Sequence, residues 1–152
     1  MKQLSIVAAA LIFLFACKKD SNVPKDADFV FTQYACFCAG NCVSGYKIAE
    51  NKLYKGAGER CEIENLNYDS QALDAAKLAL AEALRDAIPQ MMLDAKQERY
   101  GCPDCADQGG YYVKLQTNDG ARNWYLDTRK DALPDEVRGF VEKLEQTFDA
   151  LQ

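Results

Sequence analysis

Six cysteines in three places are the residues of this sequence best suited to chemistry. They are Cys36, Cys38, Cys42, Cys61, Cys102 and Cys105, arranged as C-x-C-x3-C, a single cysteine and C-x-x-C. Thiolates bind metals, exchange disulfides or form structural bridges, and their surroundings decide which. The sequence contains no histidine. A histidine-based catalytic triad, histidine-liganded zinc or copper and histidine-ligated haem are therefore excluded.

The Cys102-Pro-Asp-Cys105 motif has the spacing of a thiol-disulfide exchange site. Such a site works when the first thiol lies at a helix N-terminus, because the helix dipole lowers the thiol pKa. Here Gly109-Gly110 and a predicted strand follow, and the βαβ context of a redox motif is missing. A thiol-disulfide oxidoreductase using Cys102 and Cys105 is therefore the alternative hypothesis, and structural bridging is the main one.

A zinc ion or an iron–sulfur cluster is another alternative, because four thiolates from two loops can surround a metal. An even number of cysteines in an exported chain indicates disulfides instead, although six cysteines allow fifteen pairings. We expect a bridge from the 36–42 loop to Cys61, and one within or from the Cys102/Cys105 pair. These bridges would staple the hairpins to the helix. We expect no metal and no cofactor.

Other candidate site residues carry weaker signals. Four carboxylates lie on predicted turns or strand ends, where solvated turn chemistry is the default: Asp104, Asp107, Asp119 and Asp127. No acid–base pair, calcium loop, Gly-x-Ser-x-Gly or phosphate-loop pattern is present. Tyr111-Tyr112 and Trp124-Tyr125 either expose aromatic edges to a sugar or protein partner, or pack within the sheet. We expect packing.

The N-terminus has the pattern of an export signal. Lys2 is followed by the apolar run Leu4 to Phe15, and small Ala16 precedes Cys17. Leu14-Phe15-Ala16-Cys17 resembles the lipobox of bacterial lipoproteins. The resemblance implies removal of residues 1–16 and lipid on the Cys17 thiol, which anchors the protein to the membrane. Several acyl chains on one cysteine give stable anchoring, whereas a single chain is marginal.

Two other interpretations of the leader remain open. An uncleaved transmembrane helix needs about 20 apolar residues. The run from Leu4 to Cys17 is shorter, and Lys18, Lys19 and Asp20 end it abruptly. An ordinary secretory signal cut at another residue is the second interpretation.

Residues 17–27 are polar, contain Pro24, and are expected to form a flexible tether before a single domain at 28–152. Lys18-Lys19-Asp20 resembles the mature N-termini of lipoproteins from the Bacteroidota group, in which such charges mark export to the cell surface. A generic linker explains them equally well. The full chain has 18 basic and 23 acidic residues. Without residues 1–16 it has 17 and 23, a net charge of −6, so nucleic acid is not an expected partner.

Alternating and helical periodicities predict the elements of the domain. Asp28 to Ala35 reads as a strand, with Phe29 and Phe31 on one face. A hairpin around Glu50-Asn51 is expected to end at Gly56 and Gly58, and a second is expected around Asn118-Asp119-Gly120. A helix is expected from Ser70 to Ile88, with a continuation past Pro89 to Lys96. Its predicted buried face contains Leu73, Ala76, Leu80, Leu84, Ala87 and Met91.

The last helix should begin at Pro134, with one apolar stripe: Val137, Phe140, Val141, Leu144, Phe148 and Leu151. The predicted fold class is α+β: an antiparallel sheet of about five strands with two amphipathic helices on one face, stapled by disulfides. The expected function is non-catalytic. The protein would be a lipid-anchored envelope protein, in a periplasmic or surface-exposed leaflet of the outer membrane, with a structural role or binding an envelope protein, peptide or glycan.

Overall fold

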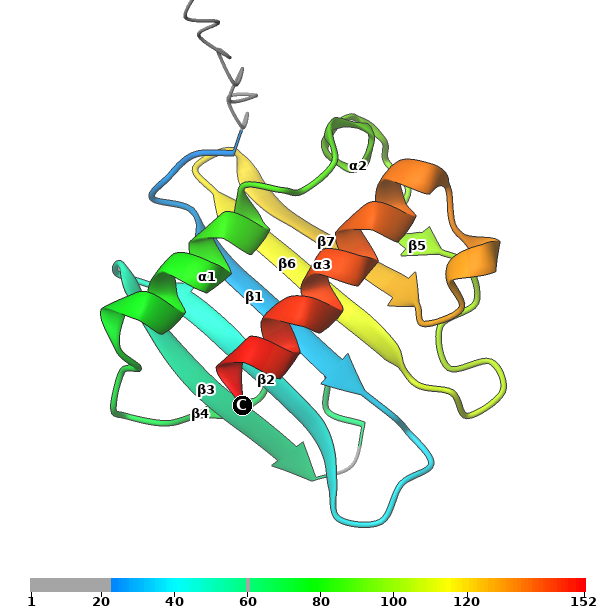
Figure 1. Ribbon diagram of the computed structural model, residues 1–152, viewed down its shortest axis with the longest axis horizontal. Coiled ribbons are helices and arrows are strands. Elements are labelled where there is room, and N and C mark those ends of the chain that lie inside the picture. Colours follow the sequence, from blue (N-terminus) through cyan, green and yellow to red (C-terminus); the bar gives the residue numbers. More distant parts are fainter. Residues whose placement is uncertain (1–22, 60) are drawn as a thin grey trace, which may run out of the picture.

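The computed structural model describes residues 23–59 and 61–152, in which a seven-stranded sheet carries helices on one face (Figure 1). The strands are β1 (Asp28–Tyr34), β2 (Asn41–Ala49), β3 (Lys52–Glu59), β4 (Asn67–Tyr68), β5 (Arg99–Tyr100), β6 (Gly110–Thr117) and β7 (Gly120–Asp127). Their order is β4-β3-β2-β1-β6-β7-β5. Every neighbouring pair is antiparallel except β5 with β7, which is parallel. The α+β class and the mostly antiparallel sheet are as predicted.

Two tight turns form the hairpins that flank the central strand β1. Glu50 and Asn51 join β2 to β3 with φ angles of 51° and 56°, the left-handed pair that a type I′ turn requires. Gly120 begins β7 with φ 128°. Both predicted hairpins are confirmed, but the first does not end at its glycines. β3 continues to Glu59, because Gly56 lets Tyr68 of β4 pack over it; a Cβ there would lie 2.8 Å from the tyrosine ring.

The described residues contain three α-helices: α1 (Ala75–Arg85) and α2 (Gln90–Asp94), which lie between β4 and β5, and α3 (Asp135–Leu151), which follows β7. The α3 helix begins just after Pro134, and its predicted stripe is buried. Figure 1 shows α1 and α3 side by side across one face of the sheet, and the two helices contact each other. This face forms the main core, in which the ring of Phe31 stacks on Phe29 and Tyr46 and meets Phe148 edge to face.

The strand count of about five and the helix count of two were too low. β4 and β5 have two residues each, too few to show a periodic pattern in the sequence. The third helix, α2, is the predicted continuation past Pro89, which separates it from α1. Arg122 donates to the carbonyl oxygens of Met92, Leu93 and Ala95, and so holds the C-terminal end of α2 against β7.

The start and the buried face of α1 differ from the prediction. The helix begins at Ala75 and not at Ser70. Asp74 caps it, because its carboxylate accepts from the Lys77 amide at 2.9 Å. Ala81 and Leu84 are fully buried, whereas Leu80 is 42 % exposed. The helix contacts β2 and β3 as well as α3, so its orientation is set by both. Periodicity alone cannot choose between neighbouring apolar stripes of one helix.

Residues 23–27 pack on the domain. Val23 and Ala27 are buried in the main core, and Arg85 donates to the carbonyl oxygen of Lys25 at 2.7 Å. Part of the stretch that we expected to form the tether therefore belongs to the folded unit.

Candidate functional site

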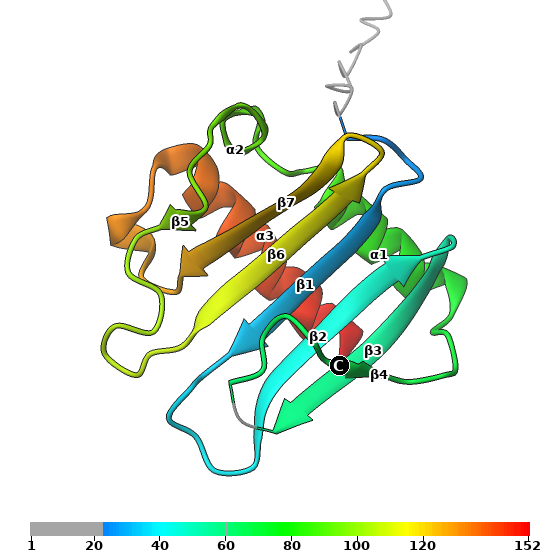
Figure 2. The ribbon, with the colours of Figure 1, turned by 180° about the vertical axis from the view of Figure 1, so that it is seen from behind.

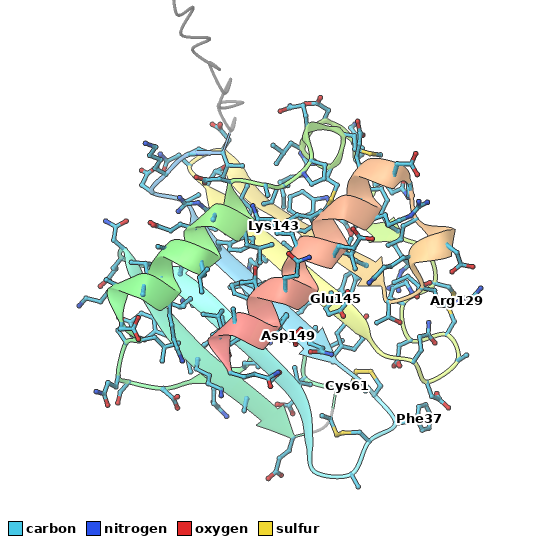
Figure 3. All side chains as sticks on the ribbon, viewed as in Figure 1. Phe37, Cys61, Arg129, Lys143, Glu145 and Asp149 are labelled. Carbon is cyan, nitrogen blue, oxygen red and sulfur yellow. A yellow bond between two sulfur atoms is a disulfide. The ribbon has the colours of Figure 1, made fainter. Side chains whose placement is uncertain are left out.

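The six cysteines form three disulfides, as the predicted framework requires. The pairs are Cys36–Cys61, Cys38–Cys42 and Cys102–Cys105, with Cα–Cα distances of 4.9, 5.5 and 5.5 Å. The expected bridge from the 36–42 loop to Cys61 is present. Cys36–Cys61 joins two loops, Cys38–Cys42 links the same loop to the start of β2, and Cys102–Cys105 closes a single turn. The expectation that the bridges staple the hairpins to a helix was therefore wrong. Figure 3 labels Cys61 near one end of the sheet, with Phe37 pointing away from the domain.

Two carboxylates hold the Cys102–Cys105 loop in place. Asp104 accepts from the Gly109 amide at 3.0 Å and from the Cys36 amide at 3.3 Å, and so links this loop to the 36–42 loop. Asp127 is 1 % exposed and accepts from the Cys102 amide at 2.7 Å and the Arg129 amide at 2.9 Å. Burial by itself raises the pKa of Asp127, but the bonds from Arg129, Cys102 and Gln108 outweigh it and lower the pKa.

The electrostatics around Cys102 oppose thiol chemistry. Residues 103–106 form a turn and β6 follows at Gly110, so Cys102 does not lie at a helix N-terminus. The ionised Asp127 accepts from its amide, and a nearby carboxylate disfavours a thiolate. Both cysteines of this pair are nevertheless exposed and bridged to each other.

The disulfides argue against the hypothesis of a metal site. Within residues 23–59 and 61–152, one group of three potential ligands has atoms within 4.8 Å of one another: Cys36, Cys61 and Asp104. The two sulfurs are bonded to each other in Cys36–Cys61. A disulfide sulfur is not a thiolate, so these residues do not offer a metal site in the oxidised protein.

The face of the sheet opposite the helices carries a second, smaller core, which we call the outer cluster. Its buried members are Tyr34, Cys42, Val43, Leu66 and Tyr112. Figure 2 shows residues 61–66, which precede β4, lying in front of this face, over β1 and β2. Leu66 and Ile63 of that segment pack on the cluster, and Cys61 anchors its start. An irregular segment, and not a helix, therefore covers this part of the sheet.

The aromatic pairs behave as the packing interpretation predicted. Tyr111 and Trp124 lie in the main core, and Tyr112 is 2 % exposed in the outer cluster. Tyr125 is half-buried, with the Arg99 guanidinium 4.9 Å from its ring centroid and its hydroxyl donating to Glu64. Burial raises the pKa of Tyr34, Tyr68 and Tyr112 to about 12, so their hydroxyls stay neutral at physiological pH.

Beside the covering segment lies a groove of about 480 Å³, which we call the outer groove. Its lining residues come from β1, β2, β4, β6 and the segment before β4: Asp28, Val30, Lys47, Glu64, Asn65, Leu66, Asn67, Tyr68, Lys114 and Gln116. Its volume is within the range of small-molecule sites. A second hollow beside the same segment is lined by residues 61–65 and Tyr125.

Sequence reasoning missed the outer groove. Strand alternation places Lys114 on the same face as Tyr112, but no sequence signal indicates that Lys47 lies two strands away in the same row. The segment from 61 to 66 has no periodicity, so its position over the sheet could not be predicted either.

Cys17 and the rest of the lipobox lie outside the described residues. Within the part of the chain that the structure describes, the helices are too short or too polar to span a membrane. No protein-family model matches the chain, and no curated protein matches it.

Proposed function

We propose that this is a lipid-anchored protein of the bacterial outer membrane whose domain binds a partner without catalysis. The outer groove carries this proposal, because helices cover one face of the sheet while the other keeps a polar hollow of ligand size. Three disulfides suit a protein exposed to an oxidising compartment. The lipobox pattern at Cys17 supplies the anchor.

The composition of the groove supports binding over catalysis. Its lining includes no cysteine, serine, threonine or histidine, the usual nucleophiles and bases of covalent catalysis. It offers instead three side-chain amides, two ammonium groups and two carboxylates, beside the apolar surfaces of Val30, Leu66 and Tyr68. Convergent polar groups beside apolar surface are typical of recognition sites.

The anchor is tested by the intact mass of the native protein extracted from membranes in detergent. We expect loss of residues 1–16, added acyl chains on Cys17, and alkylation of the other six cysteines only after reduction. An unacylated Cys17 would remove the anchor from the proposal. Protease treatment of intact cells then separates a surface-exposed leaflet from a periplasmic one.

The binding role is tested by probing glycan and peptide arrays with the detergent-extracted protein. We expect at least one ligand class to be retained by the wild type and lost by the Lys47→Ala/Lys114→Ala double variant, because both ammonium groups line the groove. If no signal on either array depends on these lysines, the groove is not a binding site.

The thiol-disulfide oxidoreductase is the second candidate, favoured by the exposure of the bridged pair Cys102–Cys105. The missing helix and the carboxylate at the Cys102 amide count against it. An oxidoreductase would catalyse insulin reduction, and a Cys102→Ser variant would lose that activity without unfolding. We expect no catalysis from the wild type.

A further inference from the structure

The floor of the outer groove contains two lysines in one row across three strands. Val30 of β1 pairs with Lys47 of β2 on one side and with Lys114 of β6 on the other. Because Phe29 and Phe31 on either side of Val30 point into the main core, Val30 and its partners face outward. Neighbouring strands lie about 4.8 Å apart, so the two lysine backbones are separated by roughly 10 Å. Their long side chains can reach one ligand group between them.

Neither lysine has an anionic partner within the described residues. No carboxylate there lies within 4 Å of Lys47 or Lys114, although the chain has more acidic than basic residues. The Lys47 ammonium lies 5.9 Å from the centroid of the Tyr68 ring, and both lysines are half-buried. Their charges are therefore available to an anion that enters the groove, where partial burial weakens screening by salt.

The other residues that line the groove indicate which class of anion it would bind. Asn65, Asn67 and Gln116 each present both hydrogen-bond donors and acceptors, the requirement for recognising hydroxyl groups. Leu66, Val30 and Tyr68 provide apolar surface for the C–H face of a ring. Asp28 and Glu64 also line the groove, and two carboxylates would repel a dianionic phosphate more strongly than a monoanionic carboxylate.

We infer that the outer groove binds a sugar that carries a carboxylate, that is, a uronic acid or an oligosaccharide containing one. Lys47 and Lys114 pair with the ligand carboxylate, the three amides bind its hydroxyl groups, and Tyr68 contacts its ring. The inference rests on the proposed binding function and names the ligand class of the same groove.

The test compares glucuronic acid with glucose, which differ only at C6, where the acid has a carboxylate and glucose a hydroxymethyl group, and uses short oligosaccharides of each. Binding to the detergent-extracted protein is measured by isothermal titration calorimetry at low salt. We expect the acid to bind at least tenfold more tightly than the neutral sugar. Lys47→Ala and Lys114→Ala should each weaken binding of the acid at least tenfold, and Lys114→Arg should retain it because it keeps the charge.

Lys55→Ala is the matched control, because it removes the same charge from the sheet. Lys55 pairs with Tyr46, a residue of the main core, and so lies on the helix-covered face. We expect this variant to bind like the wild type, and thermal unfolding to confirm that all variants are folded.

The inference would be overturned by equal binding of acid and neutral sugar, by an equal loss in Lys55→Ala, or by binding of an acidic peptide such as acetyl-aspartyl-glycine but not of the uronic acid. No binding of any of these probes would also overturn it. If an array ligand still depends on the groove lysines in that case, only the ligand class is wrong and the binding function stands.

Discussion

The two faces of the sheet are covered in different ways. On one face α1 and α3 pack over a continuous core that includes Phe31, Trp124 and Leu144. On the other an irregular segment covers the smaller outer cluster, and its start is linked to Cys36 by a disulfide. A helix satisfies its own backbone hydrogen bonds and buries a whole stripe, whereas an irregular segment has few internal bonds. A disulfide and a side-chain hydrogen bond hold this segment in place of the backbone hydrogen bonds of a helix. Because the segment covers only part of this face, a groove remains beside it.

The largest expected effect comes from breaking the helix-covered core. Phe31→Ala should lower the free energy of unfolding by about 3–5 kcal/mol, because the ring is fully buried against Phe29, Tyr46 and Phe148. Urea unfolding measures the change. Phe37→Ala is the control, since this residue is 83 % exposed and should change stability by less than about 0.5 kcal/mol. Equal losses in the two variants would mean that this core is not the main source of stability.

The second-largest effect is expected from the Cys36–Cys61 disulfide, which ties the segment over the outer cluster to the 36–42 loop. Replacing Cys36 and Cys61 with alanine removes a bridge between residues 25 apart. From the loop-closure entropy of the unfolded chain, we expect the free energy of unfolding to fall by about 3.5 kcal/mol. Replacing Cys102 and Cys105, three residues apart, should cost about 2 kcal/mol. Urea unfolding of the two double variants checks the order. The opposite order would show that local packing, and not chain entropy, dominates at these bridges.

The hydrogen bonds of Asp127, which hold the Cys102–Cys105 loop, should contribute less to stability. Asp127→Asn places an amide beside the donors of Cys102 and Arg129, and should lower the free energy of unfolding by about 1–3 kcal/mol at pH 7. Because the folded pKa of Asp127 is lowered, its contribution is present above the unfolded pKa of about 3.9 and is lost as pH falls through the folded value. Unfolding of both proteins from pH 7 to 2 should therefore show the difference shrinking below about pH 4. A difference that stays constant would exclude the charge of Asp127 as its cause.

The smallest effect on stability is expected in the outer groove itself. Lys114→Ala should change the free energy of unfolding by less than about 0.5 kcal/mol, because the side chain is only half-buried and has no ion pair among the described residues. Thermal unfolding measures this change. A loss above about 2 kcal/mol would show that Lys114 supports the fold, and binding losses in this variant could then not be assigned to the groove.

Strong local patterns predicted much of the fold. Asp28 to Tyr34 is rich in aromatic and β-branched residues, both hairpins have turn residues suited to their geometry, and the stripe of α3 repeats over four turns. The predictions that were wrong concern weak or competing patterns. Leu80 and Ala81 are adjacent apolar residues of α1, and contacts with β2, β3 and α3 select Ala81 for burial. The two-residue strands β4 and β5 exist only because a longer strand pairs with each.

The candidate site, like the fold, was only partly predictable from the sequence. The six cysteines and their use as bridges were predictable from their number, but their pairing depends on which loops meet. Nothing in the spacing of Lys47 and Lys114 indicates a shared site, since 66 intervening residues separate them in the chain.

The sequence by itself determined the α+β class, the central hairpins, the disulfide chemistry and the exclusion of histidine-dependent catalysis, because residue type and short-range periodicity suffice for these. Only the tertiary structure decided that Lys47, Val30 and Lys114 form one row and that residues 61–66 cover one end of the outer face. The physical reason is that strand register and loop position arise from contacts between residues far apart in the chain. A local pattern carries no information about such contacts.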